Sequence, residues 1–316
     1  MKSKSKKPTK AIIELPTWLG DSVMATPAIE NIIKHYEDIE ITLIGSIVAT
    51  ETLKNNPFVT NIIVNDKKIN SLFRICIALE KFDILFSFRS SIRAKLLKLC
   101  IRSVKKYQFS NKNYSRRHQV EKYVDFVNHS LNTDFLAGEL KVYHNNKIEK
   151  LPRKILGINP GASYGSAKRW YPEKFAKIAI ELSNQFDIWI FGGDNEVNFA
   201  KEIEKILINN NINNYFNHAG KTSIPQLIQH ISKLDILITG DSGPMHIAAS
   251  LKIPTVAIFG PTNYQETSQW MNPQSIIIRK NLECQPCMKR VCPLNHHNCM
   301  KEINASEVIN KISMIY

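Results

Sequence analysis

The chain has 316 residues, of which 43% are hydrophobic and 22% charged, and its formal net charge is +14. A single hydrophobic core stops growing near about 250 to 300 residues, so this length predicts two domains. No apolar run approaches the roughly 18 to 20 residues that span a bilayer, and the stretch AIIEL after the basic N-terminus is too short for a signal-peptide core. We therefore expect a cytoplasmic protein that does not cross a membrane.

The first functional candidate along the chain is Asp21, which lies in LPTWLGDSVMATPAI at residues 15–29. A short apolar strand is expected just before this run, and an amphipathic helix begins within it. Backbone amides at the start of a helix favour an anion. Asp21 is therefore either a helix-capping acid or a catalytic base held on a rigid turn between strand and helix.

The first half alternates short β-rich runs with amphipathic helical patterns, and strands are expected at 11–15, 41–44, 61–64 and 84–86. A polar stretch with a proline at 144–154 indicates a linker. A second series then begins, with strands expected at 155–158, 188–191, 236–239 and 255–259. This alternation predicts an α/β fold with two doubly wound domains, 1–150 and 151–316. Ligands of such sheets bind at the carboxyl ends of the strands, so a cleft between the domains is the expected site.

Positive charge is concentrated in the first half. Between Asp83 and Glu121 the sequence has ten Lys and Arg residues and no acidic residue. Such a block suggests an anionic partner, which is nucleic acid, an acidic lipid surface or a phosphorylated substrate. A solvated basic surface without a partner is the alternative. The sequence has no recognised nucleic-acid-binding motif, so we expect no nucleic-acid partner.

The common nucleotide-binding fingerprints are absent. No candidate strand is followed by G-x-G-x-x-G, and AGKT at 219–222 lacks the first glycine of a P-loop. The segment INPGASYGSAKRWYPEKFAKI at 158–178 instead predicts a strand, a Gly/Ser-rich loop and a helix that begins near Pro172. Loop amides can hold a phosphate there, with a hydroxyl from Ser163 and a charge from Lys168. An ordinary connecting loop is the alternative.

Acidic residues follow two later strands of the second half. FGGDNE contains Asp194 and Glu196, and TGDSGPMH contains Asp241 and His246. Acids at such a sheet edge commonly accept hydrogen bonds from ribose or sugar hydroxyls, although each is equally suited to capping a helix. The tripeptide Gly-Asp-Ser at 20–22 occurs again around Asp241, so each half has an acid between an apolar strand and a helix.

Four cysteines gather in CQPCMKRVCPLNHHNC at 284–299, with two histidines among them. A C-x-x-C pair with further Cys and His residues can hold zinc. The spacing matches no standard zinc finger, however, and disulfides are not expected in a reducing cytoplasm. We predict no metal in the functional site, and a structural metal at Cys284, Cys287, Cys292 and Cys299 stays open as the alternative.

Seven segments together resemble the bacterial lipopolysaccharide heptosyltransferases of glycosyltransferase family 9, and type II members most of all. They are LPTWLGDSVMATPAI, FSFRSSIRAKLL, INPGASYGSAKRWYPEKF, FGGDNE, TGDSGPMHIAAS, TVAIFGPTN and CQPCMKRVCPLNHHNCM. The resemblance runs in order from about residue 11 to residue 305, while the N-terminal lysine tail and residues 102–150 match no known pattern. It implies the GT-B architecture, with two Rossmann-like domains facing across a cleft. It also implies inverting transfer of heptose from ADP-heptose to the lipopolysaccharide inner core.

The resemblance further implies roles for individual residues. Asp21 matches the general base, and Arg89 and Arg93 are expected on the acceptor side, in the first domain. Lys168 matches the lysine that grips the donor diphosphate and supports catalysis, with Ser163 beside it. The other donor-binding residues expected in the second domain are Asp194 or Glu196 at the ribose, with Asp194 preferred, and Thr222, Asp241, Ser242, Gly243 and His246.

An inverting transfer needs a base for the acceptor proton and stabilisation of the leaving diphosphate, so no metal or cofactor is expected to be required. The expected partners are ADP-heptose, an inner-core acceptor on Kdo-lipid A, and an anionic membrane surface contacted peripherally on the cytoplasmic face. Three alternatives stay open: a type I enzyme acting on Kdo2-lipid A, a GT-B transferase using another nucleotide sugar, and a nucleic-acid or zinc-binding module. The sequence has no signal that defines an oligomeric state.

Overall fold

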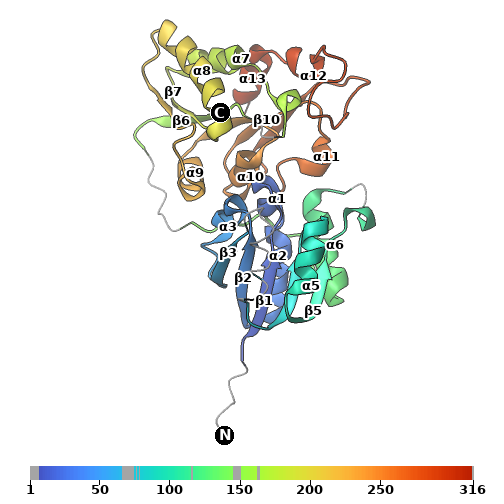
Figure 1. Cartoon of the computed structure of the whole chain (residues 1–316). Helices are drawn as coiled ribbons and strands as arrows, with labels where there is room; N and C mark the ends of the chain where they lie inside the picture. Colours follow the sequence, from blue (N-terminus) through green and yellow to red (C-terminus); the bar gives the residue numbers. More distant parts are fainter. Residues whose placement is uncertain are drawn as a thin grey trace. The chain divides into compact units, whose positions relative to one another are not determined.

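The computed structural model describes residues 7–65, 75, 77, 79–114, 117–144, 151–161 and 164–314. The chain divides into two compact units, Met1–Asn145 and Asn146–Tyr316, each built on its own sheet (Figure 1). The chain passes from one unit to the other within the polar stretch at 144–154.

The first unit contains a five-stranded sheet in the order β3-β2-β1-β4-β5, and all neighbouring strands are parallel. Its strands are β1 (Thr9–Glu14), β2 (Ile39–Gly45), β3 (Val59–Val64), β4 (Phe82–Ser87) and β5 (Ser103–Gln108). Its helices are α1 (Leu19–Met24), α2 (Thr26–Tyr36), α3 (Ile47–Leu53), α5 (Ile92–Cys100), the 3-10 turn η1 (Asn111–Asn113) and α6 (Gln119–Leu131). The strand order reverses between β1 and β4, which is where a doubly wound sheet opens a crevice at its carboxyl ends.

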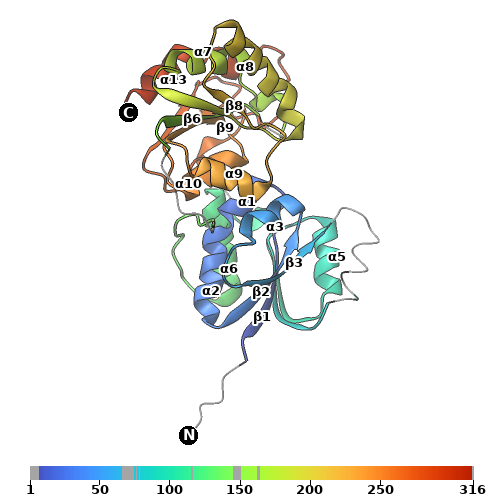
Figure 2. The ribbon, with the colours of Figure 1, turned by 90° about the vertical axis from the view of Figure 1, so that its left-hand side faces the viewer.

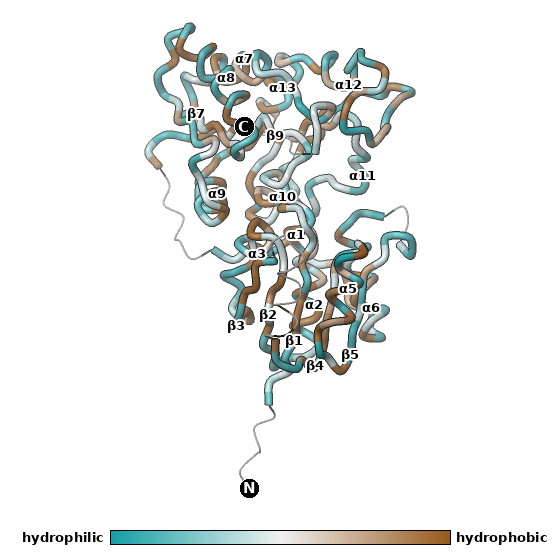
Figure 3. The backbone as a smooth tube through the Cα atoms, in the orientation of Figure 1, coloured by the Kyte–Doolittle hydropathy of each residue, from teal (hydrophilic) through white to brown (hydrophobic). Residues whose placement is uncertain are grey.

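The central strands of this unit are apolar along their length because helices cover both faces of the sheet. Residues Ala11, Ile12 and Ile13 of β1 are completely buried, whereas the edge strand β5 is mostly half-exposed. Figure 3 shows the hydrophobic colour concentrated on the central strands. Helices α2 and α6 pack side by side on one face, and α5 lies on the other (Figure 2).

The second unit contains a six-stranded parallel sheet in the order β11-β10-β9-β6-β7-β8. Its strands are β6 (Lys154–Asn159), β7 (Phe186–Ile190), β8 (Tyr215–Asn217), β9 (Ile236–Gly240), β10 (Thr255–Phe259) and β11 (Ser275–Arg279). Its helices are η2 (Ser166–Lys168), α7 (Pro172–Leu182), η3 (Asp194–Glu196), α8 (Val197–Asn209), α9 (Ile224–Ile231), α10 (Gly243–Ser250), α11 (Tyr264–Thr267), α12 (Asn298–Lys301) and α13 (Ala305–Ile312). The order reverses between β6 and β9, so the expected ligand position lies at the carboxyl ends of these two strands.

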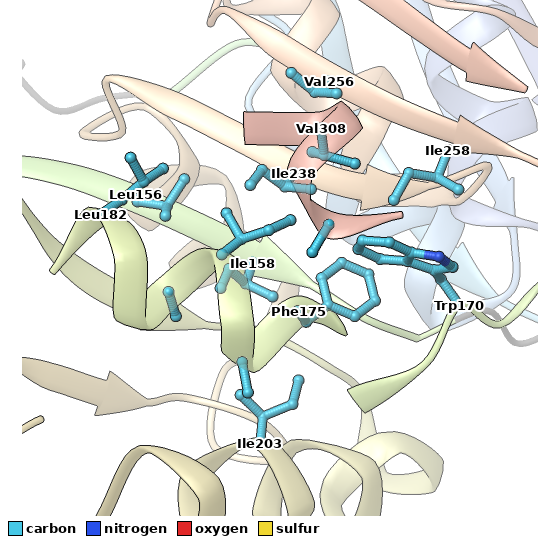
Figure 4. Close-up of a cluster of buried hydrophobic side chains, with 14 of the residues drawn as sticks. Leu156, Ile158, Trp170, Phe175, Leu182, Ile203, Ile238, Val256, Ile258 and Val308 are labelled. Atoms are coloured by element: carbon cyan, nitrogen blue, oxygen red, sulfur yellow. The ribbon is translucent and has the colours of Figure 1, made fainter. Parts of the chain in front are cut away.

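Trp170 anchors the loop that precedes α7. Its side chain is 1% exposed and packs against Phe175, with ring centroids 4.9 Å apart. Figure 4 shows both rings beside Ile258 in the hydrophobic core of the second unit. The indole Nε1 donates to the backbone oxygen of Ile303 at 3.2 Å. Because Trp170 lies two residues after Lys168, this burial fixes the end of the lysine loop.

All eight strands predicted from the sequence are present in the structure. Three further strands, β5, β8 and β11, were not predicted. Each is an edge strand of its sheet. Within the described ranges, no helix has both the length and the apolar composition needed to cross a membrane.

A pair of histidines packs together in the second unit. His218 and His230 lie with ring centroids 4.5 Å apart, and both rings pack edge-on to Trp189. Burial is the main cause that lowers the pKa of His218 to about 4, and the charge of His230 adds to it. Burial also lowers the pKa of His230.

We expect stability to fall as the pH drops from 6.5, the ordinary histidine pKa, towards about 4, because only the unfolded chain takes up these protons in that range. His218→Phe removes one proton-binding group and should flatten this dependence, as measured by melting temperature between pH 7.5 and pH 5. His35→Gln, at an exposed histidine of the first unit, is the control. An equal pH dependence in His218→Phe and wild type would contradict the prediction.

Candidate active site

A pocket of about 310 Å³ opens at the carboxyl ends of β1, β4 and β5 in the first unit. Trp18 and Asp21 line it from the β1 side, Arg89 from the loop after β4, and Tyr123 from α6. The structure therefore brings together the proposed base Asp21 and the cation Arg89, which are far apart in the sequence and which the resemblance assigns to the acceptor side. Their position is the switch point of the doubly wound sheet.

Asp21 is half-buried in the first turn of α1, and a phenol lies close to its carboxylate. Tyr123 is only 3% exposed. Burial raises the pKa of Tyr123 well above 10, and the negative charge of Asp21 raises it further. The tyrosine hydroxyl thus stays protonated at neutral pH, which gives the pocket a neutral polar group beside its carboxylate.

Beneath Arg89 lies a buried carboxylate that sequence analysis did not single out. Glu14, the last residue of β1, is 1% exposed and accepts a 2.5 Å hydrogen bond from the Ser87 hydroxyl. Its other carboxylate oxygen is 3.5 Å from a guanidinium nitrogen of Arg89. Burial raises the pKa of Glu14, while the Ser87 hydrogen bond and the charges of Arg89 and Arg93 oppose that rise. Glu14 therefore holds Arg89 in place at the pocket.

Arg93 has a different environment from Arg89. It lies in the first turn of α5, and its guanidinium donates to the side-chain oxygen of Asn65 at 2.8 Å. It is not among the residues that line the pocket. Of the two arginines expected on the acceptor side, Arg89 alone faces the pocket with Asp21.

In the second unit, Lys168 and Asp241 form a buried ion pair. The Lys168 ammonium lies 2.6 Å from the Asp241 carboxylate, and the two side chains are 12% and 6% exposed. The hydroxyl of Thr262, in the loop after β10, donates to the same carboxylate oxygen at 2.7 Å. The loops after β6, β9 and β10 are thus joined through one carboxylate.

A second group of hydrogen bonds links the ends of β6 and β9. The amide nitrogen of Asn159 donates to the hydroxyl of Thr239 at 3.1 Å and to that of Ser242 at 3.0 Å. Ser242 is also the residue before α10, whose first residue is Gly243. His246 follows one turn later in α10 and is 2% exposed. Lys168, Asp241, Ser242, Gly243 and His246 therefore all belong to the switch-point region of this sheet.

The remaining donor-side candidates follow β7 and β8. Glu196 is 6% exposed and its carboxylate accepts from the backbone N–H of Gly193 at 2.7 Å, which is a helix-capping arrangement. A side chain at Gly161 would collide with it, since a Cβ there would lie 2.1 Å from Glu196 Cγ. Asp194 is exposed, and Thr222 lies just before α9. Ser163 lies outside the described residues.

The cysteine-rich segment packs against the lysine loop. The backbone N–H of Ala167 donates to the carbonyl of Arg290 at 3.0 Å, and His297 Nε2 lies 2.9 Å from the carbonyl of Ala167. A carbonyl only accepts, so Nε2 carries a proton, and in the neutral ring Nδ1 accepts from the Tyr171 hydroxyl at 3.0 Å. Both ring nitrogens of His297 are thereby occupied.

Among the residues that the structure describes, no three His, Cys, Asp or Glu side chains form a group suited to holding a metal ion. The thiols nevertheless lie near one another. Burial raises the pKa of Cys299 to about 11, and the charges of Cys284, Cys292 and Cys287 contribute to the rise. Through Arg290 and His297, this segment contacts Ala167 and so supports the loop that carries Lys168.

The first unit is a doubly wound parallel sheet with a pocket that contains Asp21, and the second is another with a paired lysine at its switch point. These two units fit the GT-B class of glycosyltransferases. The family model of glycosyltransferase family 9 (heptosyltransferase) matches residues 82–298. The chain belongs to this family.

Similar proteins agree with this assignment. The chain is 41% identical over 310 residues to lipooligosaccharide heptosyltransferase 2 of Campylobacter jejuni serotype O:2, covering 96% of this chain and 97% of that protein. The structure of E. coli ADP-heptose lps heptosyltransferase II has a TM-score of 0.83 with 20% identity, covering 97% of this chain and 98% of that one. The structure of E. coli heptosyltransferase WaaC with ADP has a TM-score of 0.76 with 13% identity, covering 98% and 100%. At these identities the two solved structures support the fold.

Proposed function

We propose that this enzyme is a type II heptosyltransferase, which transfers heptose from ADP-heptose to the heptose of the lipopolysaccharide or lipooligosaccharide inner core, with inversion at the anomeric carbon. The observation that carries the proposal is the 41% identity, over nearly the full length of both chains, to the C. jejuni lipooligosaccharide heptosyltransferase 2. The placement of Asp21 and Lys168 at the carboxyl ends of their own sheets supports it.

The second unit is proposed to bind the donor. The ammonium of Lys168 has three N–H donors, so it can contact a phosphate while it remains paired with Asp241. The backbone amides around Ser242 and Gly243, at the start of α10, add positive dipole ends in the same region. Asp194 is the better candidate for the ribose hydroxyls because its side chain is exposed, whereas the Glu196 carboxylate already caps Gly193.

The first unit is proposed to bind the acceptor. Asp21 takes the proton of the attacking hydroxyl as the bond to the anomeric carbon forms, and Arg89 holds an anionic group of the acceptor. The protonated Tyr123 hydroxyl beside Asp21 adds a neutral partner without adding charge. The leaving diphosphate receives its stabilisation from Lys168 and the loop amides of the second unit.

The direct test is ADP release from ADP-heptose with two acceptors, Kdo2-lipid A and heptosyl-Kdo2-lipid A. A type II enzyme releases ADP only with the heptosylated acceptor. Release with Kdo2-lipid A alone would identify a type I enzyme. Release with a UDP- or GDP-sugar in place of ADP-heptose would identify a different GT-B transferase.

Arg89→Gln is expected to raise the acceptor KM by about 10-fold, because a charge-assisted hydrogen bond is lost, while the donor KM stays unchanged. Arg93→Gln is the matched comparison and should have a smaller effect, since Arg93 is bonded to Asn65 and does not line the pocket. Steady-state kinetics with each substrate varied in turn measure both values. A rise in the donor KM alone would reverse the assignment of acceptor and donor to the two units.

We also propose that turnover requires no metal or cofactor, because Lys168 and backbone dipoles are positioned to stabilise the leaving group. Turnover should therefore persist in excess EDTA. Complete loss of activity that returns on adding a divalent cation would reject this proposal. Zinc released from the purified protein by denaturation would instead locate a structural ion, and its removal should lower the melting temperature rather than the turnover number.

The partner proposed for the basic block is the anionic cytoplasmic face of the inner membrane. Three apolar side chains at the α5–β5 edge point into solvent: Ile92, Leu99 and Val104 are 79%, 72% and 65% exposed. Lys95 of α5 is exposed, and the Lys106 ammonium of β5 donates to the carbonyl of Leu99 at 3.2 Å. Apolar side chains surrounded by cations suit the boundary between lipid headgroups and acyl chains, where each cation contributes about 1 kcal/mol to binding.

Co-sedimentation with vesicles tests this surface. Binding to vesicles that contain anionic phosphatidylglycerol, with little binding to pure phosphatidylcholine, is the expected result. Leu99→Ser should weaken it, whereas Leu136→Ser, at a residue of the same unit that is 88% exposed but lies outside this edge, should not. Equal binding by the two variants would reject the α5–β5 edge as the membrane contact.

A further inference from the structure

Tyr164 has two cationic groups over its ring. The Lys168 ammonium lies 4.8 Å from the ring centroid, and the Arg290 guanidinium carbon lies 5.2 Å from it. Lys168 comes from the loop after β6, whereas Arg290 belongs to the cysteine-rich segment, more than a hundred residues further along the chain. Two segments thus bring positive charge to the same side chain.

The position of Arg290 is set by its backbone rather than by its exposed side chain. Its carbonyl accepts the N–H of Ala167 at 3.0 Å, and the neighbouring Met288 carbonyl accepts the Tyr164 hydroxyl at 2.8 Å. The approach is so close that a Cβ at Gly165 would lie 2.3 Å from the Arg290 carbonyl oxygen. Glycine is therefore required at 165, and the backbone of Arg290 is held beside the lysine loop, with its guanidinium over the Tyr164 ring.

The charges around Tyr164 are incompletely balanced. The Lys168 ammonium is already paired with the Asp241 carboxylate at 2.6 Å, so this pair has no net charge. Within the described part of the chain, no carboxylate forms an ion pair with Arg290. A diphosphate carries more than one negative charge, and a single lysine that is shared with an aspartate does not neutralise it. A multiply charged anion at this place would be stabilised by the second cation.

We infer that Arg290 is a second diphosphate-binding cation, which the cysteine-rich segment delivers to the donor site. This inference rests on the proposed function, because it needs the donor diphosphate at Lys168. Arginine suits the role because its planar guanidinium can contact two phosphate oxygens at once and can stack on an aromatic ring. Through the leaving group it would support transfer as well as binding.

ADP binding by calorimetry tests the inference on the full-length enzyme. Arg290→Gln should raise the dissociation constant for ADP by about 10-fold or more, the size expected for a lost charge-assisted contact. Lys289→Gln is the matched control, since it removes the same charge from the adjacent exposed residue and should change the constant by less than about 2-fold. Both variants should keep the wild-type melting temperature, because Arg290 is anchored through its backbone.

Donor kinetics provide the second measurement. Arg290→Gln should lower kcat/KM for ADP-heptose, and Arg290→Lys should recover only part of it, because an ammonium lacks the planar two-point contact. This inference alone would be overturned if Arg290→Gln and Lys289→Gln bound ADP equally well, while wild type bound ADP and Lys168→Ala bound it more weakly. Failure of the wild-type enzyme to bind ADP would overturn the proposed function and this inference together.

Discussion

Replacement of Asp21 by asparagine is expected to lower the rate of heptose transfer by roughly 10²- to 10⁴-fold, the range typical for removal of a general base. Asparagine keeps the shape of the side chain, but it does not take up the acceptor proton. ADP affinity should stay within a few-fold of wild type, since the proposed donor residues belong to the second unit. Turnover under saturating donor and acceptor, with calorimetry of ADP, measures the two effects separately.

A role in capping alone gives the opposite pattern. Trp18 is the N-cap of α1 and Asp21 is its third residue, so asparagine would lose only the interaction of the carboxylate with the helix dipole, about 0.3 to 1 kcal/mol. Activity and melting temperature would then both remain close to wild type. Asp134→Asn is the matched control, because it removes an exposed carboxylate from the same unit away from the pocket. Turnover of Asp21→Asn within a few-fold of that control would remove Asp21 from the reaction and leave the pocket as a binding site only.

The strands that sequence analysis missed share a physical cause. β5, β8 and β11 all lie at the edges of their sheets, where only one side is paired and side chains remain partly exposed. β5 reads SVKKYQ, in which two lysines interrupt the apolar pattern, and β8 has only three residues. The strands that were predicted include the central ones, where burial on both faces demands a continuous apolar run. The hydrophobic pattern of a sequence therefore predicts the central strands of a sheet better than its edge strands.

The candidate site shows a similar division. Residues after strands, such as Asp21, Lys168 and Asp241, could be predicted because the carboxyl ends of parallel strands gather ligand-binding groups. Their partners could not. Asp241 is 73 residues from Lys168 in sequence, and no local pattern specifies that the two pair. In the sequence, Glu14 is a single acidic residue in an apolar strand. Its contacts with Ser87 and Arg89 form only because β4 pairs with β1.

The cysteine-rich segment illustrates the limit most clearly. Its Cys and His residues leave a structural metal open as an alternative when read as sequence, because side-chain chemistry is all that the pattern contains. In the structure its backbone carbonyl and its His297 ring bind Ala167, and these contacts join positions 123 and 130 residues apart. Every residue has a backbone carbonyl, and only the fold determines which His297 nitrogen carries the proton. The sequence pattern therefore does not predict these contacts.

Replacement of Lys168 by alanine is expected to weaken ADP binding by roughly 1.5 to 3 kcal/mol, or about 10- to 150-fold, because the diphosphate loses a charge-assisted partner. The buried ion pair adds a second effect. Asp241 is 6% exposed, and without the ammonium its carboxylate keeps the Thr262 hydroxyl but no positive partner. Loss of one partner from a buried pair is strongly destabilising, so the melting temperature of Lys168→Ala should also fall.

The double variant Lys168→Ala/Asp241→Asn separates the structural effect from the binding effect. It removes both charges, so no uncompensated carboxylate remains buried, and the melting temperature should recover most of the loss. ADP affinity should not recover, because the ammonium that contacts the diphosphate is still absent. Calorimetry and thermal unfolding of the single and double variants give both values. Recovery of ADP affinity together with stability would mean that Lys168 supports the loop without touching the diphosphate, and the donor site would then have to rely on other cations of the second unit.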